Sequence, residues 1–325
     1  MSDDIQGVQE VINTLLNQPP TIDANDWPYR VDFLKFQRYG VWAEICRTCL
    51  NQTEDSIKKI WFLIEEANAR RRLDSLAELT QAGVLLELAK KRIGGLSKKQ
   101  ASKELVNRLY ELIGYHGGWT YGPIGNFALE AISHASSLEV AEKAKNERGI
   151  LFAKYHIAYA RLKQSIAVNQ NIREKFAFFI LAHDELFSCL TADDEEDKRW
   201  RLNLQFHFFF FQWLIQKEYP NSEEMRLLKE AIQESNREDM YGAWIVFRAI
   251  SLLKTPQKAL EKCQSIEQAK VGNYWYYLSQ VVRAHVWYKL GKAREVANLC
   301  HQITKLKEVP SVHLTQAIIA TDLWK

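Results

Sequence analysis

The chain has 325 residues, of which 47% are hydrophobic and 26% charged, with only 14 glycines and 7 prolines. This composition predicts an ordered protein with a large core and excludes an intrinsically disordered or collagen-like chain. The formal net charge of +3 is small for this length, so it gives no indication that the molecule as a whole is drawn to nucleic acid or to a membrane.

The first residues, Met-Ser-Asp-Asp, are acidic where a signal peptide would be basic, and no apolar run approaches the ~18 residues that cross a bilayer. The five cysteines form no framework of close pairs; they are Cys46, Cys49, Cys189, Cys263 and Cys300. We therefore expect a cytoplasmic protein that does not enter a membrane.

Apolar residues recur at helical spacing along almost the whole chain, and no run shows the strict alternation of a half-buried strand. The sequence thus predicts an all-α fold. In chain order we expect helices at about 3–17, 27–39, 41–51, 54–72, 74–92, 98–114, 126–136, 138–167, 171–190, 197–218, 222–235, 238–254, 256–266, 273–290, 292–306 and 311–324.

Several helix ends are marked by residue type. Asp26 before Trp27-Pro28 is typical of an N-cap, and Ser97–Gln100 and Asn221–Glu224 have the spacing of capping boxes, the first the sharper of the two. Gly94-Gly95 and Gly291 are expected C-terminal stops.

The N-terminal region, residues 1–114, contains two patterns that could carry chemistry. Cys46 and Cys49 form a Cys-x-x-Cys pair, but they lie in a helical pattern without a second ligand pair, which favours small core residues over a redox or zinc site. Residues 70–108 are locally basic and could meet phosphates or an acidic partner. The charges gather at helix ends, however, which favours a solvated surface.

Residues 115–125 concentrate four of the chain's glycines, and we interpret them as an ordered loop that separates the N-terminal region from residues 126–325. The aromatic and imidazole side chains of this loop could contact a ligand: Tyr115, His116, Trp119 and Tyr121. The alternative, a tight connection with its aromatics in the core, is favoured.

An acidic run, Asp193-Asp194-Glu195-Glu196-Asp197, has the Asp-Asp-x-x-Asp spacing with which isoprenoid synthases hold magnesium and a diphosphate. The second motif of those enzymes is incomplete, because Ala192 stands where its glutamate should be. Acids at the start of a helix are the simpler interpretation.

A short pattern recurs near both ends of the chain. Gly291-Lys-Ala-Arg-Glu-Val aligns without a gap on Gly40-Val-Trp-Ala-Glu-Ile, and Cys300 then stands at the place of Cys49. From about residue 197, three long aromatic helices are each followed by a turn and a shorter amphipathic helix. A shift of about 37 residues places Phe210 on Phe247 and Ala284.

The clearest of these units carries Ala284, Trp287, Gly291 and Ala293, followed by Pro310, and it resembles the tetratricopeptide repeat. The resemblance covers about a third of the chain, and other right-handed helical-repeat families share its features. It implies a solenoid of antiparallel helix hairpins whose first helices line a concave, peptide-binding surface. The side chains that this register places there are His207, Phe211, Trp244, Arg248, Ser251, His285 and Tyr288.

The sequence therefore predicts a scaffold or adaptor that binds a protein or peptide, without catalytic residues, metal or cofactor of its own; nucleic acid is not an expected partner. The first alternative is a ligand-sensing regulatory protein that acts through a partner. The second is a magnesium-dependent enzyme of isoprenoid-synthase type using Asp193, Asp194 and Asp197.

Overall fold

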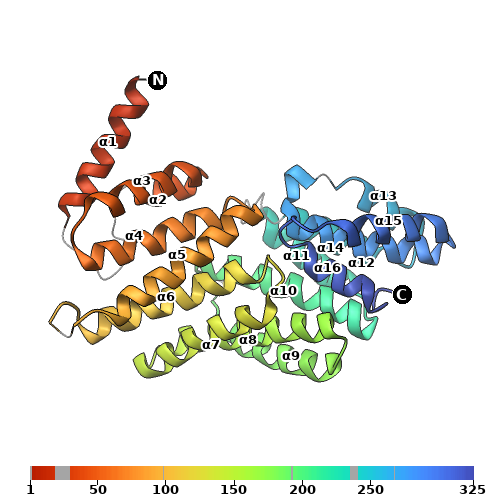
Figure 1. Cartoon of the computed structure of the whole chain (residues 1–325). Coiled ribbons are helices and arrows are strands. Elements are labelled where there is room, and N and C mark those ends of the chain that lie inside the picture. Colours follow the sequence, from red (N-terminus) through yellow and green to blue (C-terminus); the bar gives the residue numbers. More distant parts are fainter. Residues whose placement is uncertain (1, 19–29, 98, 192, 235–240, 267) are drawn as a thin grey trace. The chain divides into compact units, whose positions relative to one another are not determined.

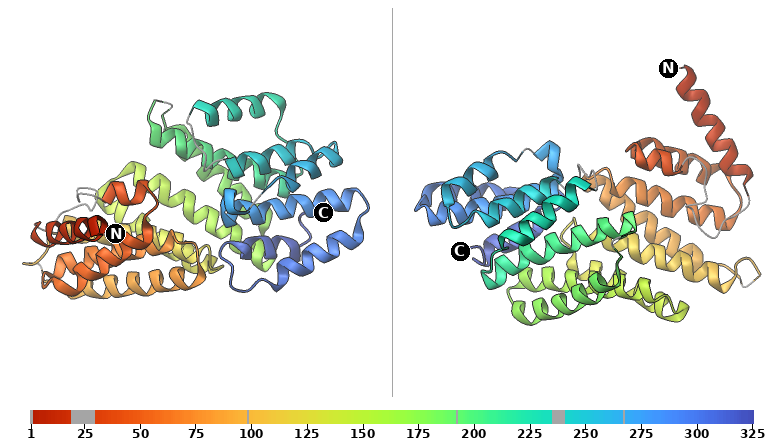
Figure 2. Two further views of the ribbon diagram at one scale, coloured as in Figure 1. Left: turned by 90° about the horizontal axis from the view of Figure 1, so that it is seen from above. Right: turned by 180° about the vertical axis from the view of Figure 1, so that it is seen from behind.

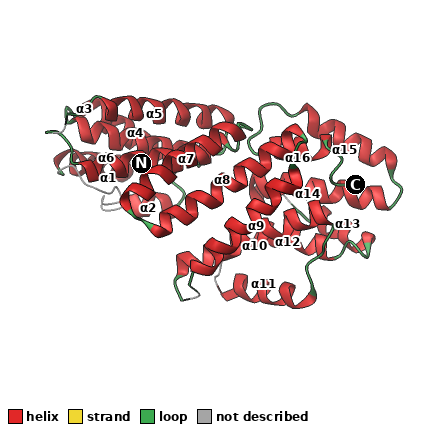
Figure 3. Ribbon diagram, turned by 90° about the horizontal axis from the view of Figure 1, so that it is seen from below, coloured by secondary structure: helices red, strands yellow, loops and turns green. Residues whose placement is uncertain are grey.

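The computed structural model describes residues 2–18, 30–97, 99–191, 193–234, 241–266 and 268–325. These residues form sixteen helices and no strand, which confirms the all-α fold (Figure 3). The chain divides into two compact units, residues 1–157 (unit 1) and 158–325 (unit 2). The loop expected to separate two regions, residues 115–125, lies within unit 1.

The helices of unit 1 are α1 (Ser2–Asn17), α2 (Arg30–Lys35), α3 (Tyr39–Gln52), α4 (Ser56–Arg71), α5 (Leu76–Gly94), α6 (Lys103–Tyr121) and α7 (Phe127–Ala144). Helix α8 (Glu147–Val168) crosses from one unit into the other. From α3 to α7 each helix packs against the next in sequence, as the orange-to-yellow series in Figure 1 shows.

Helix α4 is the central helix of unit 1, in contact with α3, α5 and α6. Every residue from Ile60 to Arg70 is buried, so this stretch of the helix has no solvent face. Its start is fixed by Asp55, whose side chain accepts hydrogen bonds from the backbone N–H groups of Ile57 and Lys58 at 2.8 and 2.9 Å.

The glycine-rich segment is not the loop that the sequence predicted. Helix α6 runs through Tyr115 and Gly118 to Tyr121, and the connection to α7 is confined to residues 122–126. A Cβ atom at Gly118 would collide with the ring of His134 on α7, and one at Gly122 would lie 2.8 Å from the carboxylate of Glu130. Gly118 and Gly122 therefore permit close packing of α6 and α7, whereas Gly125, with a φ of +82°, lies in the turn between them.

Unit 2 contains α9 (Ile172–Cys189), α10 (Glu195–Gln216), α11 (Ser222–Glu234), α12 (Tyr241–Ser251), α13 (Pro256–Gln264), α14 (Gln268–Lys289), α15 (Ala293–Lys305) and α16 (Val312–Ala320). Alternate helices pack on one another: α10 on α12, α12 on α14 and α14 on α16. The helices between them, α11, α13 and α15, each contact both neighbours in this series, whose helices are coloured from green to blue in Figure 2.

The predicted capping boxes have different outcomes. Asn221 and Glu224 exchange reciprocal bonds, with the N–H of Glu224 donating to Asn221 at 2.9 Å and the N–H of Asn221 donating to Glu224 at 2.7 Å. At the other box, Gln100 accepts the N–H of Ser97, but α6 begins only at Lys103, with Ser102 as its N-cap. The ranking of the two boxes was therefore wrong.

Three other helix ends bear on the sequence interpretation. The predicted break between residues 136 and 138 lies further on, at Lys145, which ends α7 in the left-handed conformation. Gly291 has a φ of +70° in the turn before α15, whereas the Gly40 of the recurring pattern lies inside α3. The N-cap expected at Asp26 lies outside the described residues.

Among the described helices, none combines the length and the apolarity needed to cross a lipid bilayer.

Candidate functional site

A groove lies on unit 1 where α3, α4 and α5 meet, with a volume of about 510 Å³. Each of the three helices contributes both apolar and polar side chains to it. Its lining consists of Arg47, Leu50, Asn51, Leu63, Glu66, Arg70, Ala77, Glu78, Gln81, Leu85 and Leu88.

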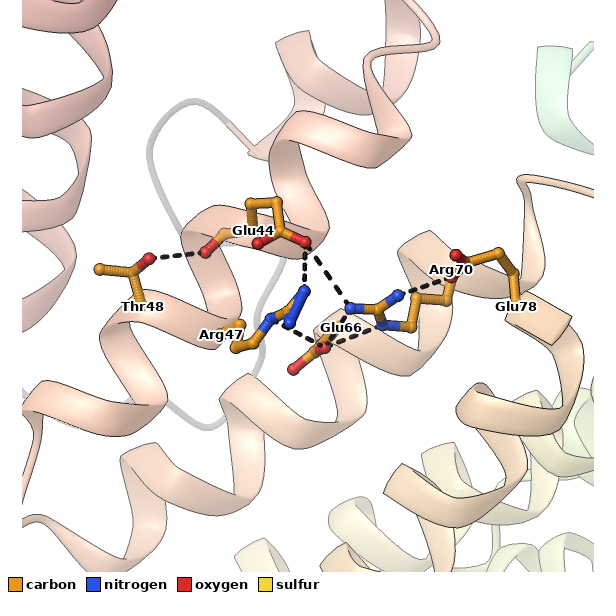
Figure 4. Close-up of polar contacts among 6 residues, drawn as sticks. All are labelled: Glu44, Arg47, Thr48, Glu66, Arg70 and Glu78. Carbon is orange, nitrogen blue, oxygen red and sulfur yellow. Dashed lines mark hydrogen bonds and ion pairs between the residues drawn. The ribbon is translucent and has the colours of Figure 1, made fainter.

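Arg70 is the centre of a polar network in this groove (Figure 4). Its Nε and Nη2 both lie 2.8 Å from Oε1 of Glu66, one turn earlier on α4, and its Nη1 lies 2.6 Å from Glu78 of α5. Helix α3 adds Glu44, 3.7 Å from Arg70, and Arg47, which pairs with Glu44 and lies 3.9 Å from Glu66. The network therefore ties three helices together.

Exposure increases from the base of the network to its rim. The side chain of Glu66 is 3% exposed and that of Arg70 10%, whereas those of Arg47 and Glu44 are 48% and 63% exposed. Burial raises the pKa of Glu66, and the hydrogen bonds and charge of Arg70 oppose that shift. Glu66 is thus a buried carboxylate that needs Arg70, while the rim groups remain accessible to a partner.

The chemistry of the groove follows from its charges and its apolar lining. Two carboxylates (Glu66, Glu78) and two guanidinium groups (Arg47, Arg70) line the groove and balance in charge. Glu44, which pairs with Arg47 beside this lining, gives the network one net negative charge. Leu88 is 39% exposed at the edge of the groove. A ligand with an apolar anchor and a cationic group would match this arrangement.

The concave-surface residues predicted by the repeat register fall into three groups in unit 2. The first group consists of Phe211 and His207. Phe211 is completely buried, and the ring of His207 stacks on those of Tyr159 and Trp275, with centroid distances of 4.9 and 5.6 Å. The burial of Phe211 removes it from any surface, contrary to expectation.

The second group is covered by the C-terminal residues. His285 is 2% exposed and its Nδ1 donates to the carbonyl oxygen of Trp324. Tyr288 is 48% exposed and makes an edge contact with the ring of Trp324. His285 is therefore also unavailable to a partner in this structure.

The third group lies on α12. Ser251 Oγ donates to the carbonyl oxygen of Arg248, whose side chain is exposed, and Trp244 packs against Phe247 at 6.4 Å. Helix α12 packs on α10 and α14, which carry the other two groups, but Phe211 and His285 are buried, so the predicted residues do not form one exposed site.

The four residues of the expected loop lie on α6. His116 is buried, while Tyr115, Trp119 and Tyr121 are half-buried. Trp119 makes an edge contact with His156 at 5.1 Å, and Tyr115 makes one with His116 at 5.3 Å. These contacts agree with the alternative that the aromatics belong to the core.

The other sequence candidates have structural contacts of their own. Burial raises the pKa of the Cys49 thiol to about 12 and that of Cys46 well above its usual value, so both are protonated core thiols at neutral pH. Asp194 accepts the N–H of Asp197 at 2.8 Å, and the buried Asp197 accepts the N–H of Thr191 at 2.9 Å. These two acids thus stabilise the start of α10.

Sequence reasoning did not find the groove. The sequence predicts that the basic cluster at 70–108 is solvated, but Arg70 is 9% exposed and paired. The available signal was the pair Glu65-Glu66 inside an apolar run of α4, with Arg70 four residues after Glu66. What could not be deduced was that Glu78 of α5 and Arg47 of α3 approach this part of α4.

No family model matches the chain, and neither a curated protein nor a solved structure is significantly similar to it.

Proposed function

We propose that this chain is a non-catalytic, cytoplasmic scaffold of tetratricopeptide-like helix hairpins that binds a segment of a partner protein. The observation that carries the proposal is the groove between α3, α4 and α5, in which leucine side chains lie beside a fixed network of charges. Peptide-binding sites on helical proteins combine apolar anchoring pockets with charged groups that fix orientation.

The packing in unit 2 supports the repeat. Alternate helices contact one another, and one further helix connects each such pair and contacts both of its members, as expected for stacked hairpins. The register of about 37 residues brings Phe210, Phe247 and Ala284 into equivalent places, and all three are buried. It also aligns Lys217 with Gly291, and both have a positive φ at the end of a long helix.

The partner segment that fits the groove carries aliphatic anchors and a basic residue. Its aliphatic side chains would pack on Leu50, Leu85 and Leu88, and its cation would meet Glu44 or Glu78 at the rim. The preference for a cation follows from the net negative charge of the network.

The test measures binding of fluorescent peptide pools to the full chain by anisotropy. One pool alternates Leu with Lys, and a second has Glu in place of every Lys. We expect the basic pool to bind more tightly, and Leu88→Glu to weaken binding about tenfold or more, because the change places a charge in the apolar part of the groove.

Leu129→Glu is the matched control, since Leu129 of α7 is also 39% exposed in unit 1 but does not line the groove. It should bind as the wild type does. Equal binding by wild type and Leu88→Glu, or a preference for the acidic pool, would contradict the proposed site.

A further inference from the structure

Within the described part of unit 1, three buried polar atoms near the end of α4 have no hydrogen-bond partner: Nδ2 of Asn68, Nε of Arg71 and Nδ1 of His116. Asn68 is 1% exposed and His116 5%. Leaving a buried donor unsatisfied costs about 1–3 kcal/mol. Several such atoms in one place therefore require an explanation, such as a group that binds there.

Asn68 and Arg71 are directly joined. Nη2 of Arg71 donates to Oδ1 of Asn68 at 2.9 Å, and Nε of Arg72 approaches the same oxygen at 3.4 Å. This contact fixes the amide orientation, because a flipped amide would turn its NH₂ group against two cations. The NH₂ of Asn68 thus adds donors to a cluster that already consists of donors.

Among the described residues, the cluster has a positive charge without a carboxylate of its own. The phenol of Tyr115 has the largest pKa-raising influence on Arg71, and Glu65 is the first carboxylate after it. Glu65 is already bound by Arg30 at 2.7 and 3.1 Å and by Trp42 at 3.3 Å. Burial and the neighbouring Arg72 lower the pKa of Arg71 to about 10, which is the behaviour of a cation that lacks compensation.

His116 shares this environment. Burial lowers its pKa well below the usual value, and the charge of Arg71 is the next largest cause, followed by those of Arg30, Arg72 and Arg108. The ring is therefore neutral at pH 7 and can donate one N–H.

The helix dipole does not account for the cluster. A cation in the last turn of a helix is favourable, and Arg92 supplies one at the end of α5 while remaining exposed. Arg71 and Asn68 instead have buried donor atoms. Burying these atoms costs free energy, and an interaction with the helix dipole does not require it.

We propose that the C-terminal end of α4 binds a phosphate group, held by Arg71, Arg72 and Asn68, with His116 on its inner side. A phosphate supplies acceptor oxygens for the unsatisfied donors and the negative charge that the cluster lacks. Arg71 is only half-buried, so the ligand has a route from solvent. The ring of Tyr39 lies 5.5 Å from the guanidinium of Arg72 and steadies it.

The test compares the thermal midpoint of the full chain in sodium phosphate with that in sodium chloride of equal ionic strength. Phosphate stabilises folded proteins in general, so binding is measured by the difference between variants. We expect the midpoint in phosphate to rise more for the wild type than for Arg71→Gln, and titration calorimetry with inorganic phosphate to give saturable binding. Arg71→Gln should weaken this binding about tenfold or more. Arg92→Gln, which removes an exposed cation from the last turn of α5, should leave it unchanged.

Asn68→Asp gives a second, independent measurement, because it places a carboxylate beside Arg71 and Arg72 within the same side-chain volume. We expect this variant to unfold at a higher temperature than the wild type in chloride and to show a smaller rise in phosphate than the wild type does. O-phosphoserine distinguishes the source of the phosphate: tighter binding than inorganic phosphate indicates an esterified ligand. A rise in phosphate no larger for the wild type than for Arg71→Gln, without saturable binding, would overturn the proposal.

Discussion

At the scale of single residues, the packing role of the glycines in and after α6 could not be deduced from the sequence. Gly114 and Gly118 lie four apart in α6 and Gly122 is its C-cap, a spacing that places all three on the same side of the helix. Each glycine within a helix costs roughly 1 kcal/mol relative to alanine, so local preference indicated a loop. The close approach of α7 outweighs that preference, and it cannot be deduced from the segment itself.

Gly118→Ala should destabilise unit 1 by about 1–3 kcal/mol, because the added methyl group would collide with the buried ring of His134. Gly40→Ala is the matched control: this glycine lies inside α3 with open space around a new Cβ atom. It should gain roughly 0.5–1 kcal/mol from helix propensity. Urea unfolding measures both changes, and a loss of similar size in the two variants would refute the packing role of Gly118.

At the scale of helices, capping residues determine where an element begins, and spacing alone identified them incompletely. Ser97 and Gln100 have the right types at the right separation, yet their contact forms ahead of α6, whose first turn is capped by Ser102. The two serines differ in whether the chain after them continues as a helix, which depends on the packing of Leu105 and Leu109 into the core of unit 1.

Ser102→Ala should cost about 1 kcal/mol of stability, since the Ser102 hydroxyl accepts the N–H of Leu105 at 3.1 Å. Ser97→Ala, the same change ahead of the helix, should cost a few tenths of a kcal/mol at most, because its contact with Gln100 is exposed. Chemical denaturation measures the loss of stability in each variant. A larger loss for Ser97→Ala than for Ser102→Ala would contradict the helix start at Ser102 and support the one predicted at Ser97.

Element positions were nevertheless the most predictable level of the structure. The all-α class follows from the recurrence of apolar residues at helical spacing. This spacing is present along nearly the whole chain because each helix has a side that faces the core. The groove was not predictable, because its charges come from α3, α4 and α5 and meet only through packing. Phe211 and His285 were misplaced for a related reason: neither the repeat register nor the periodicity indicates that the core of unit 2 encloses Phe211 and that Trp324 covers His285.

At the scale of the whole molecule, the described residues build two cores rather than one. The last residues belong firmly to the second core: Trp324 is 2% exposed, donates from Nε1 to the carbonyl oxygen of Ile319 at 3.3 Å and accepts from His285. A buried tryptophan at the end of a chain connects its terminal residues to α14 and α16.

Trp324→Ala should cost about 3–5 kcal/mol, the usual penalty for emptying a buried tryptophan site. Hydrogen exchange followed by mass spectrometry should show faster exchange in α14 and α16 and unchanged protection in α4 and α5 of unit 1. A uniform loss of protection through both units would instead indicate a single cooperative core.

The sequential packing of α3 to α7 has a further consequence, for the kinetics of folding. Contacts between helices adjacent in sequence close only short loops, so this part of the chain has a low contact order and should fold rapidly. Helix α4 can be completely buried only after the helices around it have formed, because every residue from Ile60 to Arg70 is buried in the folded protein. During synthesis, α4 would therefore stay incompletely buried until α5 and α6 have left the ribosome, and nascent chains that end before α6 should be more sensitive to proteases than longer ones.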